Sequence, residues 1–383
     1  MKTSHVVYLA CALGNALAHP CLPLGGVLTA QQPAVVAISE EPICPQCVIR
    51  VTPHVRLGTR AASKGPVGLP SAIVVDNSQR YWLLGSGTPI VFDSVGKEVE
   101  SVAAGRERNR PFAHPYHAVT VADSVIVFDP VSGVASVIGP NLEWVRDIGF
   151  DIAVTRMAVI RWPDVVIGSG LLTTPQAIGW GLHRIGIRDG NSALLRSFGS
   201  GDGQLRYRAS ELVYERPTGV SRDGSFWSFY RANYDLTRWD STQQAVQRLK
   251  RRPGWFPEAT QSSIGGPRQS PSPVISAVQV DSAGLLWVFA SVPSAAWPTA
   301  WPPARPGLVE VPISSVALEK LYRTAIEVID PEAKRVVART FLDSWVVEAL
   351  PNGRAVTYEV DQSGKKHFSI VSLTIDYGQP PSV

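Results

Sequence analysis

The stretch AIVVD at residues 72–76, followed after a short polar turn by YWLL at residues 81–84, decides the fold. Two short runs rich in β-branched and aromatic residues, joined by a turn, predict a β-hairpin. Further copies of the unit are GVS with FWSF at residues 219–229, AVQVD with LWVF at residues 277–289, and VEAL with AVTY at residues 347–358. In every copy the residue that closes the first run lies six positions before Trp82 or its counterpart, which indicates a structural repeat.

A second hairpin follows the first in each well-marked repeat. Its first strand is marked by IVFD at residues 90–93, HRIGIR at residues 183–188, LTRWD at residues 236–240, or IEVID at residues 326–330. An Asp closes or directly follows each of these runs, where its carboxylate can accept hydrogen bonds from the turn backbone. We therefore interpret these Asp residues as turn-forming and not as catalytic.

Two hairpins supply four antiparallel strands, which is one blade of a β-propeller. Repeats that start near residues 72, 117, 155, 217, 276 and 346 predict six blades, although the second and third are poorly marked. The sixth lacks an outermost strand, and the β-rich segment 47–57 can supply it and remove a free sheet edge. The predicted fold is an all-β, six-bladed propeller over residues 48–376, closed by this N-terminal strand and followed by a tail at 377–383.

The pattern GLPSAIVVD at residues 68–76, with Tyr81, Trp82, IVFD at residues 90–93 and Gly96, resembles exported bacterial six-bladed propellers of the NHL-like and TolB-like kind. The resemblance covers most of residues 48–376 and implies the fold. It implies no single function, because this scaffold carries lyases, lactonases, receptors and binding modules. The Asn-His-Leu signature itself is absent, so the resemblance assigns no catalytic residue.

The N-terminus is typical of a secretory signal peptide. Lys2 gives a positive start, residues 6–18 are mostly apolar, and Ala16 and Ala18 form a small-x-small cleavage site before His19. The apolar run is shorter than the roughly 20 residues that span a bilayer, and no later segment is long enough. We expect a signal peptide at 1–18, a leader at 19–47, no transmembrane span in the mature chain, and a secreted or periplasmic location. Lipidation at Cys11 or Cys21 is a less favoured alternative, because neither site has the required flanking residues.

The Cys44-x-x-Cys47 motif has three interpretations, namely a redox site, half of a zinc site with His54 nearby, or a small-loop disulfide. No thioredoxin-like βαβ pattern surrounds it, and the further zinc ligands are missing. In an oxidising compartment we favour a structural disulfide, and we predict no metal site and no cofactor.

Positive charge is concentrated in four loops that we expect on one face of the propeller, at residues 58–70, 103–117, 199–211 and 250–274. These loops hold eleven Lys and Arg against four Asp and Glu, whereas the whole chain carries only +4. A one-sided positive field favours anionic partners, while the mild total charge gives no reason to expect nucleic acid. Plain solvated surface is the alternative. The candidate ligand-binding cations are Arg106, Arg108, Arg110, Arg206 and Arg208.

Two further features are candidates at the same face. His114 and His117 form the chain's only close His pair and could bind a metal or move protons, although a pair without carboxylates is more often structural. The insertion at residues 291–323 carries Trp297 and Trp301. These indoles could stack on a sugar or an apolar ligand, or pack the insertion onto the propeller, which is the interpretation we favour.

The sequence is compatible with more than one class of function. No G-x-S-x-G, H-E-x-x-H, P-loop or EF-hand pattern is present. We expect a monomeric, non-catalytic binding or scaffold propeller that recognises an anionic glycan, a peptide or an envelope protein. The alternatives are a propeller enzyme, a lyase or hydrolase that uses His114 or His117 with an Arg, and an envelope-assembly component resembling TolB-like proteins.

Overall fold

The computed structural model describes residues 33–57, 70–85, 87–99, 112–170, 172, 174–175, 177–200, 215–257, 266, 268–302, 316–361 and 366–378. All of them belong to the unit Pro33–Val383. The predicted binding residues Arg106, Arg108, Arg110, Arg206 and Arg208 lie outside the described residues, as does the predicted signal peptide.

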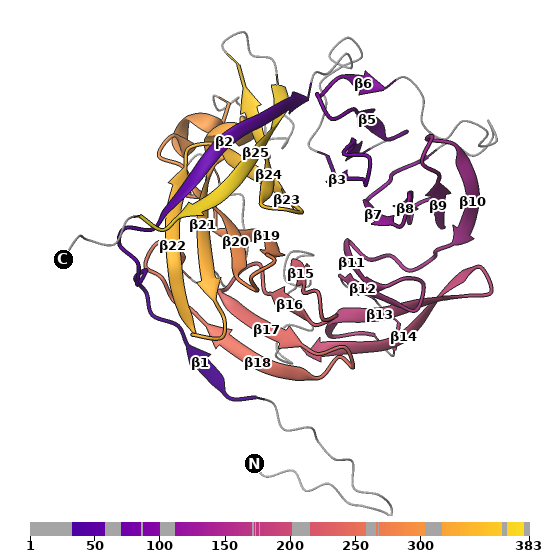
Figure 1. Ribbon diagram of the computed structural model, residues 1–383, viewed down its shortest axis with the longest axis horizontal. Coiled ribbons are helices and arrows are strands. Elements are labelled where there is room, and N and C mark those ends of the chain that lie inside the picture. Colours follow the sequence, from indigo (N-terminus) through magenta and orange to yellow (C-terminus); the bar gives the residue numbers. More distant parts are fainter. Residues whose placement is uncertain are drawn as a thin grey trace, which may run out of the picture. The chain divides into compact units, whose positions relative to one another are not determined.

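Antiparallel strands, each paired with the next along the chain, build almost the whole unit (Figure 1). The first three groups of strands are β3 (Ala72–Val75), β4 (Tyr81–Leu84), β5 (Ile90–Phe92) and β6 (Glu98–Val99); β7 (His117–Val121), β8 (Ser124–Asp129), β9 (Val134–Ile138) and β10 (Trp144–Gly149); and β11 (Arg156–Arg161), β12 (Val165–Ser169), β13 (Trp180–Arg188) and β14 (Asn191–Ser200).

The remaining groups follow the same order. They are β15 (Thr218–Val220), β16 (Phe226–Phe229), β17 (Asp235–Trp239) and β18 (Ala245–Lys250); β19 (Val274–Val280), β20 (Leu286–Pro293), β21 (Tyr322–Asp330) and β22 (Arg335–Leu342); and β23 (Trp345–Leu350), β24 (Arg354–Val360) and β25 (Lys366–Asp376). Two N-terminal strands, β1 (Val35–Ala37) and β2 (Val48–Leu57), join later sheets, and the described helices are the single turns η3 (Trp297–Ala300) and α2 (Leu318–Leu321).

The first strands of these groups contact one another in a closed cycle. β3 contacts β7, β7 contacts β11, β11 contacts β15, β15 contacts β19, β19 contacts β23, and β23 contacts β3. The sheets therefore radiate from a common centre, with later strands farther out (Figure 1). This arrangement defines a β-propeller-like fold. Two of the groups, β7–β10 and β11–β14, are hydrogen-bonded into one eight-stranded sheet through a single parallel pair, Gly149 with Asn191.

The six-residue spacing that marks the repeat has a direct physical cause. The indole Nε1 of Trp82 donates to the Asp76 carboxylate over 2.9 Å, and Trp287 Nε1 donates to Asp281 over 3.0 Å. The same carboxylates accept backbone N–H groups of their turns, from Arg80 at 2.9 Å and from Leu285 at 3.0 Å. In the second hairpins, the prediction that the Asp residues form turns is confirmed at three positions: Asp93, Asp240 and Asp330 each accept a turn N–H over 2.9 Å, from Lys97, Gln244 and Ala333 respectively.

Buried apolar side chains fill the space between neighbouring sheets. Trp227 and Phe229 of β16, for example, share one cluster with Val288 and Ala290 of β20. Burying such side chains contributes about 1.5–3 kcal/mol each. Short second strands such as β4, β12 and β16 are therefore buried at every position, because both of their faces pack against neighbouring sheets.

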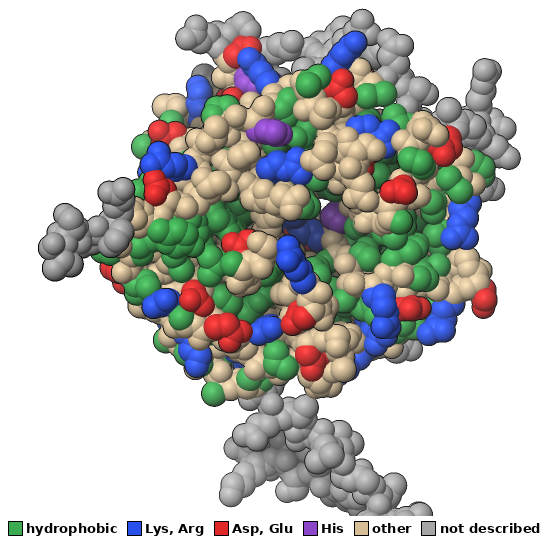
Figure 2. All heavy atoms as spheres, in the orientation of Figure 1, with side chains coloured by type: hydrophobic (Ala, Val, Ile, Leu, Met, Phe, Trp, Pro, Cys, Tyr) green, Lys and Arg blue, Asp and Glu red, His purple; other side chains and the backbone are tan. Residues whose placement is uncertain are grey.

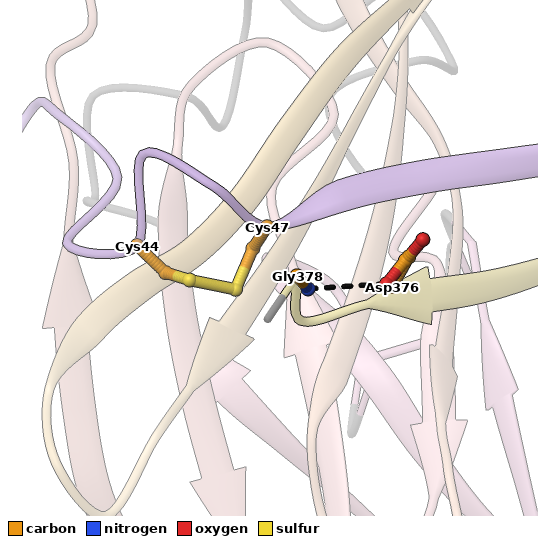
Figure 3. Close-up of a disulfide and its surroundings, with 4 residues drawn as sticks. All are labelled: Cys44, Cys47, Asp376 and Gly378. Atoms are coloured by element: carbon orange, nitrogen blue, oxygen red, sulfur yellow. Dashed lines mark hydrogen bonds between the residues drawn. A yellow bond between two sulfur atoms is a disulfide. The ribbon is translucent and has the colours of Figure 1, made fainter. Parts of the chain in front are cut away.

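Strand β2 pairs antiparallel with β25 in a register that runs from Val48 opposite Asp376 to Leu57 opposite Phe368. It is the outermost strand of the sheet β2-β25-β24-β23. A disulfide between Cys44 and Cys47 closes the turn directly before β2, and Figure 3 shows it beside the end of β25, where the Gly378 N–H donates to Asp376 over 3.1 Å. The first and last described segments are thus held together.

The segment directly before the disulfide, which belongs to the predicted leader at 19–47, packs in part against the outer strands. Val35–Ala37 adds to β18 as a parallel fifth strand, and the Ile43 N–H donates to the carbonyl of Val336. Strand β1 has no signal in the sequence, because three residues paired with a strand far along the chain are too few to show a period.

Arg251 holds this segment in place. Its guanidinium donates to the carbonyls of Ser39 and Glu40 and to the Glu327 carboxylate at 2.9 Å, and both charged side chains of that ion pair are fully buried. Arg251 belongs by sequence to the basic loop 250–274, but its side chain is buried and adds no charge to the surface. Because its guanidinium binds two backbone carbonyls as well as the Glu327 carboxylate, Arg251 stabilises the fold.

Candidate functional site

Five ionisable side chains gather where the first strands meet. We call them the central cluster: His117, Arg156, Glu215, Arg231 and Glu348. His117 opens β7, Arg156 opens β11, and Glu348 lies within β23, while Glu215 precedes β15 and Arg231 joins β16 to β17. Figure 2 shows a small hollow near the centre of this face, walled in part by His and by Lys or Arg side chains.

Arg156 lies between two carboxylates. Its guanidinium is 4.0 Å from the Glu215 carboxylate and 4.0 Å from the Glu348 carboxylate, at the outer limit of an ion pair. In the cycle of first strands, β11 contacts β7 and β15, so the link to Glu348 on β23 crosses the centre. Among the described residues the Arg156 side chain makes no hydrogen bond, so its donors are available to a further partner.

Glu215 is better paired. The Arg231 guanidinium donates directly to the Glu215 carboxylate, and Arg231 Nε donates to the carbonyl of Ile275 over 3.3 Å. Both side chains are largely buried, at 14% and 16% exposed. Removing one partner of such a buried ion pair destabilises a protein, because it leaves an uncompensated buried charge.

The neighbouring Arg216 explains why Glu215 stands at the centre. The Arg216 side chain points away into a slot, where it donates to the carbonyl of Gly199 over 2.7 Å and to the Tyr230 hydroxyl over 2.6 Å. A Cβ at Gly181 would come within 2.7 Å of its Nε, so a larger residue there would force the Arg216 side chain to shift. Because Arg216 is buried on one side, the residue before it is presented on the other.

The protonation of Glu348 is shifted by its surroundings. Burial raises the pKa of its carboxyl above the ordinary 4.5, while Arg156, the Ala349 N–H and Arg231 act in the opposite direction. The Ala349 N–H donates to the carboxylate over 3.3 Å. Desolvation prevails because Arg156 is too far away for a hydrogen-bonded pair, so this carboxyl holds its proton more readily than an exposed one.

His117 is shifted in the direction that keeps it neutral. Burial and, to a smaller extent, the nearby Arg156 lower the pKa of its imidazole from 6.5 to about 4, and a hydrogen bond with the Met157 backbone acts in the opposite direction. At neutral pH the ring therefore carries no charge and offers one donor and one acceptor. The positive charges of the cluster reside on Arg156 and Arg231.

The structure brings together only part of what the sequence predicted. His117 belongs to the central cluster, whereas the His114 ring packs against Tyr116 with centroids 4.7 Å apart, and its backbone N–H donates to Asp129 over 3.2 Å. Sequence reasoning missed Arg156, Glu215, Arg231 and Glu348. One signal was present: Arg156 and His117 both open the first strand of their repeat.

Trp297 and Trp301 pack inward. Both are partly buried against a small cluster built from Ala300, Val316, Leu321 and Tyr322. The arrangement agrees with the packing role that the sequence favoured for the two indoles, and it gives them no described contact with the central cluster.

In the described part of the chain no three His, Cys, Asp or Glu side chains gather as a metal ion requires. Nor does any helix in the described ranges combine the length and apolarity needed to cross a membrane. The chemistry that this site offers is recognition by guanidinium and carboxylate groups, with a neutral imidazole beside them.

Comparison with known proteins places the fold alone. No protein-family model matches the chain, and no curated protein matches its sequence. A candidate exported protein from Bacteroides fragilis is similar over 89% of this chain and 100% of its own, at 8% identity and a TM-score of 0.53. A DUF4221 family member from Bacteroides vulgatus covers 85% and 97% (9% identity, TM-score 0.47), and virginiamycin B lyase from Staphylococcus aureus covers 85% and 99% (11% identity, TM-score 0.41).

Proposed function

We propose that this chain is an exported, non-catalytic binding protein that recognises an anionic group of a glycan, a peptide or an envelope protein at the central cluster. The scaffold we propose is a six-bladed propeller whose ring is closed by β2. Support for the scaffold comes from the cycle of first strands and from the pairing of β2 with β25. Support for export comes from the N-terminal pattern and from the disulfide, a bond that persists in oxidising compartments.

The observation that carries the binding site is the position of Arg156. It lies 4.0 Å from two carboxylates without a hydrogen bond to either. A guanidinium binds carboxylate or phosphate through paired hydrogen bonds, and partial burial strengthens such a bond because less water competes for it. Because His117 is neutral, it adds no further charge beside Arg156, and its ring N–H can donate a hydrogen bond to the ligand.

In this proposal the role of the loop cations differs from that of Arg156. These cations are Arg106, Arg108, Arg110, Arg206 and Arg208. Positive charge near the mouth raises the local concentration of anionic ligands and the rate of their encounter. These residues would set the salt dependence of binding, whereas Arg156 would set its specificity.

The test is an array of anionic and neutral glycans and peptides, probed at about 0.05 M and about 0.5 M salt, a range in which exposed charges become screened. The variant Arg156→Gln is compared with Arg161→Gln, which removes the same charge from the exposed far end of the same strand. We expect an anionic ligand that binds the wild type and Arg161→Gln but not Arg156→Gln. Equal binding by all three proteins would refute this site.

A second function is favoured by one observation. A carboxyl with a raised pKa and a neutral imidazole both lie beside Arg156, and perturbed groups of this kind cluster at catalytic sites. A lyase or hydrolase could use His117 and Glu348 as base and acid. Incubating each ligand found on the array with the protein and recording its mass and its NMR spectrum separates the two functions, because an enzyme converts the ligand into a product, whereas a binding protein returns it unchanged.

A further inference from the structure

We infer that an anion bound at Arg156 displaces the Glu348 carboxylate, and that Glu348 takes up one proton in the same step, so that ligand binding and protonation are coupled. The inference rests on the proposed function and adds its regulation: the site takes a carboxylate-bearing ligand, and takes it more tightly as the pH falls.

The geometry makes Glu215 and Glu348 unequal. When a ligand carboxylate takes the Arg156 guanidinium, Glu215 keeps its direct ion pair with Arg231. Glu348 has no such second partner: among the described residues its carboxylate has the Arg156 ion pair at 4.0 Å and one hydrogen bond from the Ala349 N–H. Binding therefore leaves Glu348 as the carboxylate without a cation at short range.

Among the described first strands, those beside β23 offer Glu348 no replacement cation. The first strands that flank β23 in the cycle are β3 and β19, and neither contains an ionisable residue. Arg231 acts on Glu348 from across the centre, but it is already committed to Glu215. Farther groups are His117, which faces Arg156, and Tyr322, which faces Arg231.

A buried carboxylate that loses its cation is neutralised rather than left charged. Here the bound ligand also adds a negative charge close by, which further disfavours the ionised form. Burial already raises the pKa of Glu348 while Arg156 is free, so a modest additional rise suffices for proton uptake. One carboxylate enters the cluster, one carboxylate is neutralised, and the net charge stays constant.

The sign of the pH dependence follows from linkage. Where the complex holds one more proton than the free protein, affinity falls about tenfold for each unit that the pH rises. The window lies above 4.5, the ordinary pKa of Glu, because burial has raised the pKa of Glu348. His117, whose pKa is about 4, stays neutral throughout that window and does not contribute.

The experiment measures the stabilisation of the protein by simple carboxylates at constant ionic strength. The probes are D-glucuronate and N-acetylalanine, each with its neutral counterpart, D-glucose and N-acetylalaninamide, so that a sugar source and a peptide source of the carboxylate are distinguished. At each pH between 5 and 8, the apparent Kd is calculated from the increase in Tm that the carboxylate causes. Variants are Glu348→Gln, which mimics the protonated acid, Arg156→Gln, and Glu332→Gln as an exposed control.

We expect the wild type and Glu332→Gln to lose affinity steeply with rising pH, by about tenfold per unit within the window. Glu348→Gln should bind without pH dependence and at least as tightly as the wild type at pH 5. If Glu348→Gln does not fold, proton uptake by the wild type, measured by calorimetry in buffers of different ionisation enthalpy, decides the same point.

Two other results separate the inference from the proposed function. Binding that needs Arg156 but shows the same pH dependence in the wild type and Glu348→Gln, or none in either, would overturn the coupling and keep the site. No carboxylate-specific stabilisation of the wild type or of Glu348→Gln would overturn both.

Discussion

The guanidinium of Arg156 lies 4.0 Å from the carboxylate of Glu348, although their strands, β11 and β23, are not neighbours in the cycle of first strands. Each residue therefore reaches the centre from its own sheet. Neither local hairpin formation nor the packing between adjacent sheets requires this contact. This charged link across the centre is the observation on which we base the proposed binding site.

The protonation of His117 gives a prediction about stability. Its pKa in the folded protein, about 4, is below the 6.5 of the unfolded chain. The stabilisation from neutral His117 is therefore complete above pH 6.5 and is lost as the pH falls toward 4, by at most about 3 kcal/mol.

The measurement is urea unfolding of the wild type and of His117→Gln between pH 4 and pH 7.5. As the pH falls, the free energy of unfolding should decrease more in the wild type than in His117→Gln. The variant His54→Gln, at an exposed position, should show the same decrease as the wild type. A difference that does not vary with pH would mean that His117 titrates normally.

Closure by β2 is tested by two nested N-terminal truncations. A chain that starts at residue 38 loses only β1, which adds three residue pairs to the edge of β18. A chain that starts at residue 58 also loses β2, exposes the edge of β25, and removes the buried side chains of Ile49 and Leu57. An exposed strand edge promotes association.

We expect the shorter truncation to lower Tm slightly and the longer one to cause aggregation or a large drop in Tm, as read by calorimetry and light scattering. Equal Tm values for the two truncated chains would show that β2 is dispensable.

The packing of the insertion predicts that Trp297 matters for stability and not for affinity. Because its indole is partly buried against Ala300 and its neighbours, Trp297→Ala should cost about 1–3 kcal/mol, less than a fully buried Trp. Trp180→Ala, which removes an exposed indole from β13, is the control and should cost less. A Trp297 variant that keeps its Tm but loses affinity for a ring-bearing ligand would place the indole in the binding site.

Export predicts the N-terminus of the mature protein. Protein recovered from the medium or the periplasm should begin near His19, after cleavage behind Ala18. Intact-mass spectrometry reads this directly. Recovery of the mature protein with Met1 still attached would show that no signal peptide is removed.

The predictable part of the structure is the part encoded by local spacing. The spacing of Asp76 and Trp82 predicts a hairpin because the hydrogen bond between the two side chains spans a single turn. Strand β2 was predictable because its partner sheet lacked a strand. Strand β1 was missed, since three residues in parallel pairing carry no pattern of their own.

The central cluster could not be found in the same way. Arg156, Glu215 and Glu348 come from different repeats, and it is the tertiary fold that places Arg156 4.0 Å from each of the two carboxylates. Sequence analysis instead emphasised the density of Arg in loops, which points to a face but not to a site. Of the candidate residues that the structure describes, His117 lies within the cluster, whereas His114, Trp297 and Trp301 pack elsewhere.

The central claim is that Arg156 is the anion-binding group of this protein. The measurement that tests it most directly is the salt dependence of affinity for one anionic ligand, compared among the wild type, Arg156→Gln and Arg161→Gln. Our account predicts that Arg156→Gln weakens binding by at least about tenfold at every salt concentration, as expected when a charge-assisted hydrogen-bonded pair is lost. Arg161→Gln should match the wild type. Equal weakening by the two variants, or none by either, would contradict the account.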